Sequence, residues 1–175
     1  MGNRLAKKRV LVSQASDFMG PITTEFFRSE GAEVITSTRD LTSAQVCQDL
    51  VDSAGDIDVL IANLAGPTNT GIQVTDLSNE QWGSGFRYMV DPLHWLTQAV
   101  LPQMIERKKG KIVVYGSAAG LKGMKTVAAY STARAAQIGY VRAVGVEVAP
   151  HNIQINLIAQ NYVENPDYYP PELMQ

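Results

Sequence analysis

The stretch Arg9-Val10-Leu11-Val12-Ser13-Gln14-Ala15-Ser16-Asp17-Phe18-Met19-Gly20 decides the fold. Its apolar start predicts a buried strand over 9–13, its polar middle predicts a turn, and Pro21 predicts the first turn of a helix over 21–30. The same alternation of a short Val- and Ile-rich run with a longer helical segment continues along the chain. This pattern is typical of an α/β protein whose parallel sheet is doubly wound, with helices on both faces.

The remaining elements follow from the same periodicities. Strands are predicted at 33–36, 59–62, 111–115 and 154–158, and helices at 43–54, 79–108 and 127–149, with Pro92 inside the second of these. No repeat or linker interrupts the chain before a Tyr- and Pro-rich tail over 161–175. Since 175 residues, 45% of them apolar, can bury one sizeable core, we expect a single catalytic domain over 1–175.

Charge and cysteine content narrow the function classes. The 15 basic and 17 acidic residues nearly balance, which gives no reason to expect a nucleic-acid or anionic-membrane partner. One cysteine, Cys47, and two histidines exclude a disulfide framework and argue against a zinc site. The apolar run 10–12 is too short for a signal peptide or a membrane span. We expect a cytoplasmic enzyme that acts on a small molecule.

The turn after the first strand lacks the glycines of a dinucleotide site. In a strand-turn-helix that holds a pyrophosphate, three glycines let the backbone approach the phosphates, and an acidic residue ending the second strand holds the ribose. Here Gln14 and Phe18 occupy two glycine positions and only Gly20 remains. The second strand ends in 36–38, Thr-Ser-Thr, followed by Arg39, which could accept a 2′-phosphate but which we interpret as a solvated loop residue. The loop therefore lacks two of the three glycines that a pyrophosphate-binding loop needs.

A second constellation carries chemistry. Ser117 follows the fourth predicted strand, where open α/β sheets place their ligands, and Tyr130 and Arg134 lie one turn apart on the next helix. A guanidinium beside a phenol favours the phenolate, so the tyrosine can act as a base closer to neutral pH, while the serine holds the substrate oxygen. The competing interpretation is that Ser117 caps, Tyr130 packs and Arg134 is solvated. We favour function because the triad is combined with the altered loop.

With these motifs the chain resembles the short-chain dehydrogenase/reductase superfamily and, within it, the halohydrin dehalogenases, or haloalcohol dehalogenases. Their pattern Thr-x4-Phe/Tyr-x-Gly is matched with serine for threonine as Ser13-x4-Phe18-x-Gly20, and Ser-x12-Tyr-x3-Arg is matched by the triad. Further similarity lies in 58–63, 110–117, 129–134 and 158–162, the last stretches being most similar to the B-type branch. The resemblance covers nearly all of the chain and implies a Rossmann-like fold.

The resemblance implies a reaction without a nicotinamide cofactor. Ordinary dehydrogenases of the superfamily carry lysine where Arg134 stands, and their helical asparagine falls near Met89, so two redox residues are missing. The implied activity is dehalogenation of vicinal halohydrins to epoxides with release of halide and a proton, and the reverse opening of epoxides by small anions. The implied halide pocket is formed by Phe18, Gln160, Asn161, Tyr162, Val163 and Tyr169. For the tyrosines, Tyr168 included, hydrophobic anchoring of the loop is an equal alternative.

The end of the chain leaves other hypotheses open. The superfamily normally continues after Asn161 with further helices and a last strand that builds the subunit interface of a homo-oligomer, dimer or tetramer, whereas Gln175 is the final residue. We therefore expect a sheet without that strand and with an unpaired edge. The alternatives to the dehalogenase are an NADP-dependent dehydrogenase/reductase with a degenerate loop and a non-catalytic remnant.

Overall fold

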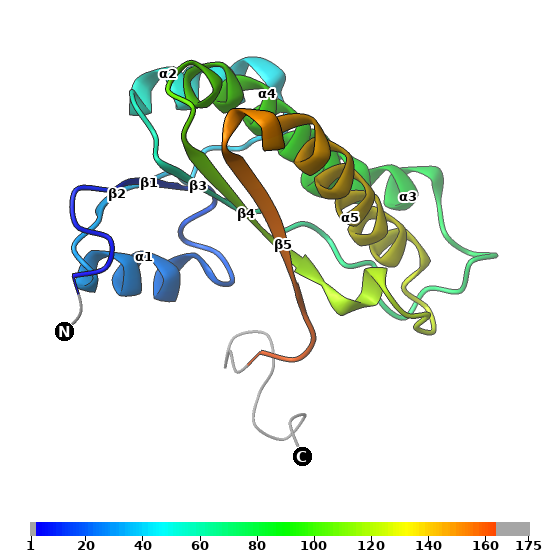
Figure 1. The fold of residues 1–175 in the computed structure, drawn as a ribbon. Helices are drawn as coiled ribbons and strands as arrows, with labels where there is room; N and C mark the ends of the chain where they lie inside the picture. The colour runs from blue at the N-terminus through cyan, green and yellow to red at the C-terminus, as the bar shows by residue number, and fades with distance from the viewer. Residues whose placement is uncertain (1–2, 164–175) are drawn as a thin grey trace.

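A five-stranded parallel sheet organises the molecule (Figure 1). The computed structural model describes residues 3–163. Within them the strands run β2-β1-β3-β4-β5 across the sheet, with bounds β1 Arg9–Val12, β2 Glu33–Thr36, β3 Val59–Asn63, β4 Gly110–Ser117 and β5 Ile153–Gln160. All five predicted strands are confirmed, and the last two are longer than predicted. In the described residues β5 is an edge strand, paired only with β4.

Helices cover both faces of this sheet, as predicted. The helix α1 (Gly20–Ser29) packs Phe27 against Val10, Val12 and Ile61 on one face. The opposite face is covered by α2 (Ala44–Ala54), α4 (Asp91–Glu106) and α5 (Ala128–Val148), as Figure 1 shows. The architecture is thus the α/β, Rossmann-like doubly wound sheet that the sequence indicates.

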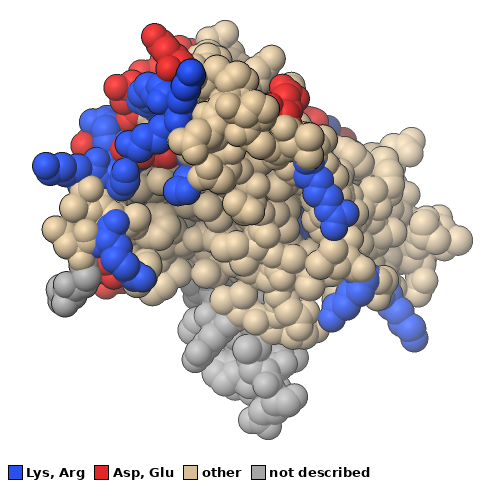
Figure 2. Space-filling view, viewed as in Figure 1, with Lys and Arg blue, Asp and Glu red and all other residues tan. Residues whose placement is uncertain are grey.

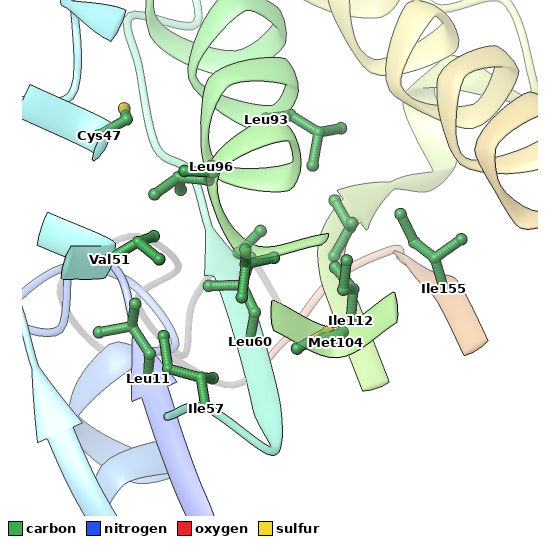
Figure 3. Close-up of a cluster of buried hydrophobic side chains, with 14 of the residues drawn as sticks. Leu11, Cys47, Val51, Ile57, Leu60, Leu93, Leu96, Met104, Ile112 and Ile155 are labelled. Atoms are coloured by element: carbon green, nitrogen blue, oxygen red, sulfur yellow. The ribbon is translucent and has the colours of Figure 1, made fainter. Parts of the chain in front are cut away.

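The main core lies between the sheet and α2, α4 and α5 (Figure 3). From the sheet Leu60 and Ile112 are fully buried, and Leu93 and Leu96 of α4 are buried above them. Strand residues alternate between the faces of a sheet, so one set meets α4 and the other set meets α1. Complete burial of such a side chain contributes about 2 kcal/mol. This core fixes the height of α4 and α5 above the sheet.

The prediction of one continuous helix over 79–108 is wrong. The structure has α3 (Asn79–Gly85), a π-helical turn (Phe86–Val90) and then α4. Pro92 lies in the first turn of α4. Because proline has no backbone N–H, it cannot donate the hydrogen bond that a continuous helix would need to the preceding turn. The widened turn accommodates this proline without ending the helical path.

The two edges of the sheet differ in chemistry. At the amino ends of the strands three ion pairs of 2.8–2.9 Å join neighbouring loops: Arg9–Glu33, Arg107–Asp56 and Lys109–Asp58. Figure 2 shows basic and acidic side chains interspersed at one end of the molecule. At the carboxyl edge the connections after β1, β3, β4 and β5 lie together because the strands are parallel. The crossover direction changes between β1 and β3, where open sheets bind ligands.

Two absences hold for the described part of the chain. Among its helices, none combines the length and the apolar character needed to cross a membrane. Its His, Cys, Asp and Glu side chains form no group of three that could hold a metal ion.

Candidate active site

The loop between β1 and α1 has a left-handed backbone at two positions that are not glycine. Gln14 has φ 43° and Phe18 has φ 46°, both in the left-handed region that favours glycine. These are the two positions at which a dinucleotide site would carry glycines. A non-glycine residue held there stores about 1–2 kcal/mol of backbone strain, and such strain is concentrated at functional sites. The left-handed backbone is retained although both positions carry side chains.

Hydrogen bonds hold this loop against the segment that follows β3. The side-chain Oε1 of Gln14 accepts from the Ala65 backbone N–H, and its Nε2 donates to the Ala65 carbonyl at 3.5 Å. The Nδ2 of buried Asn63 donates to the carbonyls of Gln14 and Asp17, both at 2.9 Å. A polar cross-link therefore spans the crevice between β1 and β3.

The one remaining glycine of the motif has a packing role. A Cβ at Gly20 would lie 2.5 Å from the carbonyl oxygen of Ala15, so a side chain there would push α1 away from the loop. The three positions of the motif are thus used differently in this chain. Gly20 lets the helix approach, whereas Gln14 and Phe18 carry side chains at two positions where a dinucleotide site has glycines. The residues present fit a dinucleotide poorly.

Space does remain beside the end of β2. A cavity of about 460 Å³ is lined by polar side chains that include Ser16, Arg28, Thr36 and Thr38. Arg39, which we interpreted as solvated, is exposed and its Nη2 lies 3.4 Å from the Ser53 hydroxyl. A larger cavity of about 720 Å³ lies between α5 and β5 and is mainly apolar. Neither cavity is lined by the residues of the triad.

Ser117 ends β4 and caps the short 3-10 helix Ala118–Gly120. Its Oγ accepts the backbone N–H of Ala119 at 3.1 Å. A hydroxyl that accepts in this way still has its own proton to donate. The capping and functional interpretations of Ser117 are therefore compatible, because the cap fixes the oxygen and leaves the proton for a substrate oxygen.

Arg134 is buried, with 6% of its surface exposed, so the interpretation as a solvated residue is wrong. Its Nη1 donates to the Tyr115 carbonyl at 3.1 Å and to Gln137 Oε1 at 3.0 Å. Its Cζ lies 5.1 Å from the centre of the Tyr130 ring. In the described residues no carboxylate forms an ion pair with this guanidinium. The guanidinium thus lies against the Tyr130 ring, and a phenolate at this position would be stabilised by a cation so placed.

A second phenol near Ser117 is a poor base. Tyr115 lies two residues earlier on β4, and its hydroxyl is 2.8 Å from the Thr23 hydroxyl. Burial raises the pKa of Tyr115, and the hydrogen bond with Thr23 only partly offsets this effect. Tyr115 therefore stays protonated at neutral pH and is a poor candidate for proton transfer.

Several polar atoms around the triad lack a partner. Among residues 3–163, the buried Nε of Arg134, Oγ of Ser131 and Oε1 of Gln160 have no hydrogen-bond partner. Gln160 is the residue of β5 that pairs with Ser117 of β4 in the sheet register. Buried polar groups are nearly always satisfied, and those that are not often await a ligand or water. Arg134 and Gln160 both lie beside the end of β4, which is consistent with a polar ligand site there.

The predicted halide residues occupy the same edge of the sheet but separate places along it. Gln160 ends β5, Asn161 and Tyr162 are exposed, and Val163 is half-buried. Phe18 is half-buried beyond the end of β1. Strands β3 and β4 intervene, and at about 4.8 Å per strand they separate β1 from β5 by about 14 Å. Phe18 and the 160–163 segment therefore follow strands that lie three positions apart in the sheet. Tyr168 and Tyr169 lie outside the described residues.

Two features of the site escaped the sequence reasoning. Gln137, fully buried on α5, accepts from Arg134, and its Nε2 donates to the Met89 carbonyl at 2.7 Å. Its signal is the spacing of three from Arg134, which puts both side chains on one helix face. The left-handed backbone at Gln14 and Phe18 carries no signal, because neither residue type favours it.

Comparisons with known proteins agree with this architecture. The short chain dehydrogenase family matches residues 3–168. A solved structure named "Dehalogenation enzyme" superposes with a TM-score of 0.87 at 30% identity, covering 98% of this chain and 79% of that chain. The 3-oxoacyl-acyl-carrier-protein reductase FabG of Thermotoga maritima is 29% identical over 93% of this chain and 77% of its own length. The acetoacetyl-CoA reductase of an Acinetobacter species is 36% identical over 68% of this chain and 47% of its own length.

Proposed function

The chain belongs to the short chain dehydrogenase family, and from that premise we propose that it is a halohydrin dehalogenase that works without a nicotinamide cofactor. The substrate is a vicinal halohydrin or, in reverse, an epoxide with a small anion. The proposed catalytic residues are Ser117, Tyr130 and Arg134.

In the proposed reaction Tyr130, as phenolate, takes the proton of the substrate hydroxyl while the Ser117 hydroxyl donates a hydrogen bond to the substrate oxygen. The oxygen then attacks the neighbouring carbon from the side opposite the halogen. The carbon–oxygen bond forms as the carbon–halogen bond breaks, and the halide leaves with the electron pair. No electrons pass to or from the enzyme. The products are an epoxide, a halide and a proton held by Tyr130, which solvent removes.

The observation that supports this proposal most strongly is the environment of Arg134. A buried guanidinium is costly unless a negative charge is nearby. Its neighbours in the described residues are a carbonyl, a neutral amide and the ring of Tyr130. The phenolate of Tyr130 is the anion that would balance it. The altered loop is further support, since Gln14 and Phe18 disfavour a dinucleotide.

The halide pocket is the less constrained part of the proposal. It places Phe18, the 160–163 segment and Tyr169 around the departing anion. Backbone N–H groups and the edges of aromatic rings suit a large, weakly hydrated anion. We further propose that the active form is one catalytic domain per chain in a homo-oligomer.

Halide release from a small vicinal halohydrin in buffer without nicotinamide tests the proposal. Tyr130→Phe should lower turnover by at least about a hundredfold because the base is lost. Tyr140→Phe is the matched control, since it removes a hydroxyl from the same helix that contacts His94. If Tyr130→Phe retains near-normal turnover, or if Tyr140→Phe loses as much, the assignment of the base fails.

A second candidate is an NADP-dependent reductase, since two of the relatives above are named as reductases. The cavity beside Arg28 and Thr38 favours it, because this position could receive the phosphate-bearing end of such a cofactor. Titration with NADPH or NADH, followed by fluorescence, separates the two candidates. Saturable binding of either dinucleotide would favour the reductase over the dehalogenase.

A further inference from the structure

Gln137 is the most deeply buried polar side chain of α5 that the proposed reaction does not use. It is 0% exposed, and both ends of its amide are bonded. Oε1 accepts from Arg134 Nη1 at 3.0 Å, and Nε2 donates to the Met89 carbonyl at 2.7 Å. Burying an amide is unfavourable unless both ends are satisfied, so a residue of this kind in a core indicates a specific contact.

The carbonyl that anchors Gln137 belongs to the π-helical turn Phe86–Val90. Met89 is itself fully buried, and α3 just before it approaches α5 closely at Gly85. A Cβ at Gly85 would lie 3.1 Å from Ala133 Cβ, which shows how little room separates the two segments. Gln137 therefore links the Arg134 guanidinium to a firmly packed part of the molecule. The guanidinium cannot turn away from Tyr130 without breaking this link.

The groups that hold Arg134 are all uncharged. On the elements packed against α5 and on α5 itself, the other ionisable side chains are those of Glu80, Arg87, Tyr88, Asp91, His94, Glu106, Lys111, Tyr115, Tyr140, Arg142, Glu147 and His151. Glu80 pairs with Arg87 at 2.8 Å. Glu147 is exposed and, at thirteen residues along the helix from Arg134, lies about 20 Å away. Asp91 forms no ion pair with Arg134. The arginine is thus oriented but not neutralised.

We propose that Gln137 is a positioning residue that holds Arg134 against Tyr130 while leaving the full charge of the guanidinium to the phenolate. This rests on the proposed function of Tyr130 as base. A glutamate would hold the arginine equally well but would cancel its charge. An apolar residue would leave the charge but not the orientation. The neutral amide provides both.

Two substitutions separate these effects. Gln137→Glu places a carboxylate on the guanidinium, and Gln137→Met fills similar space without hydrogen bonds. Val141→Ala, a buried core change one turn further along α5, is the matched control for lost packing. The first readout is the pH titration of phenolate absorbance, with the same variant carrying Tyr130→Phe subtracted, and it requires no turnover. The second is the pH profile of kcat/KM for halide release.

Gln137→Glu should move the Tyr130 phenolate midpoint and the acidic limb of kcat/KM to higher pH by about one unit. Gln137→Met should shift the midpoint by less and lower kcat roughly tenfold with little change in KM. Val141→Ala should lower stability and leave both midpoints in place. If both Gln137 variants fold and leave the phenolate midpoint unchanged, or if Val141→Ala moves it equally, the proposal is wrong. A shifted midpoint without halide release would instead contradict only the dehalogenase function.

Discussion

At the residue scale, the loop after β1 keeps the backbone conformation of a dinucleotide-binding loop but lacks two of its glycines. Gln14 and Phe18 hold left-handed φ angles of 43° and 46°. The sequence identified these positions as missing glycines, but nothing in a glutamine or phenylalanine predicts that the backbone would keep the glycine conformation. Tertiary bonds from Asn63 to the carbonyls of Gln14 and Asp17 enforce it.

This strain can be measured at Phe18. Phe18→Gly and Phe18→Ala both remove the ring, but only glycine relaxes the left-handed backbone. We expect the glycine variant to be more stable by about 1 kcal/mol in urea unfolding, the reverse of the usual order. The same two substitutions at Gln48, an exposed residue in the middle of α2, should leave the alanine variant more stable than the glycine variant. Equal stability of the two Phe18 variants would mean that the loop is not strained.

Arg134 carries the second prediction at this scale. Arg134→Lys keeps a positive charge but loses the planar group that bonds both Tyr115 and Gln137, so activity should fall and the pH optimum should rise. Arg134→Ala removes the charge from beside Tyr130 and should lose most of the halide release. Initial rates across a pH series measure both effects. An alanine variant that is folded and as active as the wild type would show that the guanidinium does not assist the base.

At the scale of elements, strands were predictable and the path between α3 and α4 was not. Each strand is a short, mainly apolar run bounded by turn residues, so the local sequence is sufficient to predict its position. The break at Phe86–Val90 depends on Pro92 together with the packing of Gly85 against α5, which only the folded structure contains. The spacing of the triad was likewise visible in the sequence. The burial of Arg134 and its bond with Gln137 were not.

The ion pairs at the amino edge give a prediction for the strand ends. Burial raises the pKa of Asp58, but bonds from Lys109 and the Arg9 backbone N–H outweigh it, so the pKa lies below the ordinary value. A lowered pKa stabilises the fold at neutral pH, and this stabilisation is lost as pH falls from the ordinary value of 3.8 through the folded value. The urea midpoint of the wild type should therefore be higher at pH 7 than at pH 3, and this difference should be smaller in Asp58→Asn. Asp76→Asn, which changes an exposed carboxylate, should keep the wild-type difference.

At the scale of the whole molecule, the proposed catalytic residues lie at the carboxyl edge of the sheet, and three of the salt bridges lie at the amino edge. The family accounts for the fold, and it also includes relatives named as reductases, so fold alone does not choose the reaction. The choice between the two reactions depends on side chains at the carboxyl edge. Gln14 and Phe18 replace two glycines of a pyrophosphate-binding loop. Tyr130 lies beside Arg134, which has no carboxylate partner in the described residues.

The most direct test of this account is epoxide opening by azide in buffer free of nicotinamide. By microscopic reversibility the proposed reaction also runs in reverse, with the anion entering where halide leaves and Tyr130 returning the proton. We predict formation of the azido-alcohol, suppressed by added bromide because both anions share one site, and absent in Ser117→Ala. If folded wild-type protein forms no azido-alcohol and instead reduces a carbonyl substrate when NADPH is supplied, the dehalogenase account is contradicted.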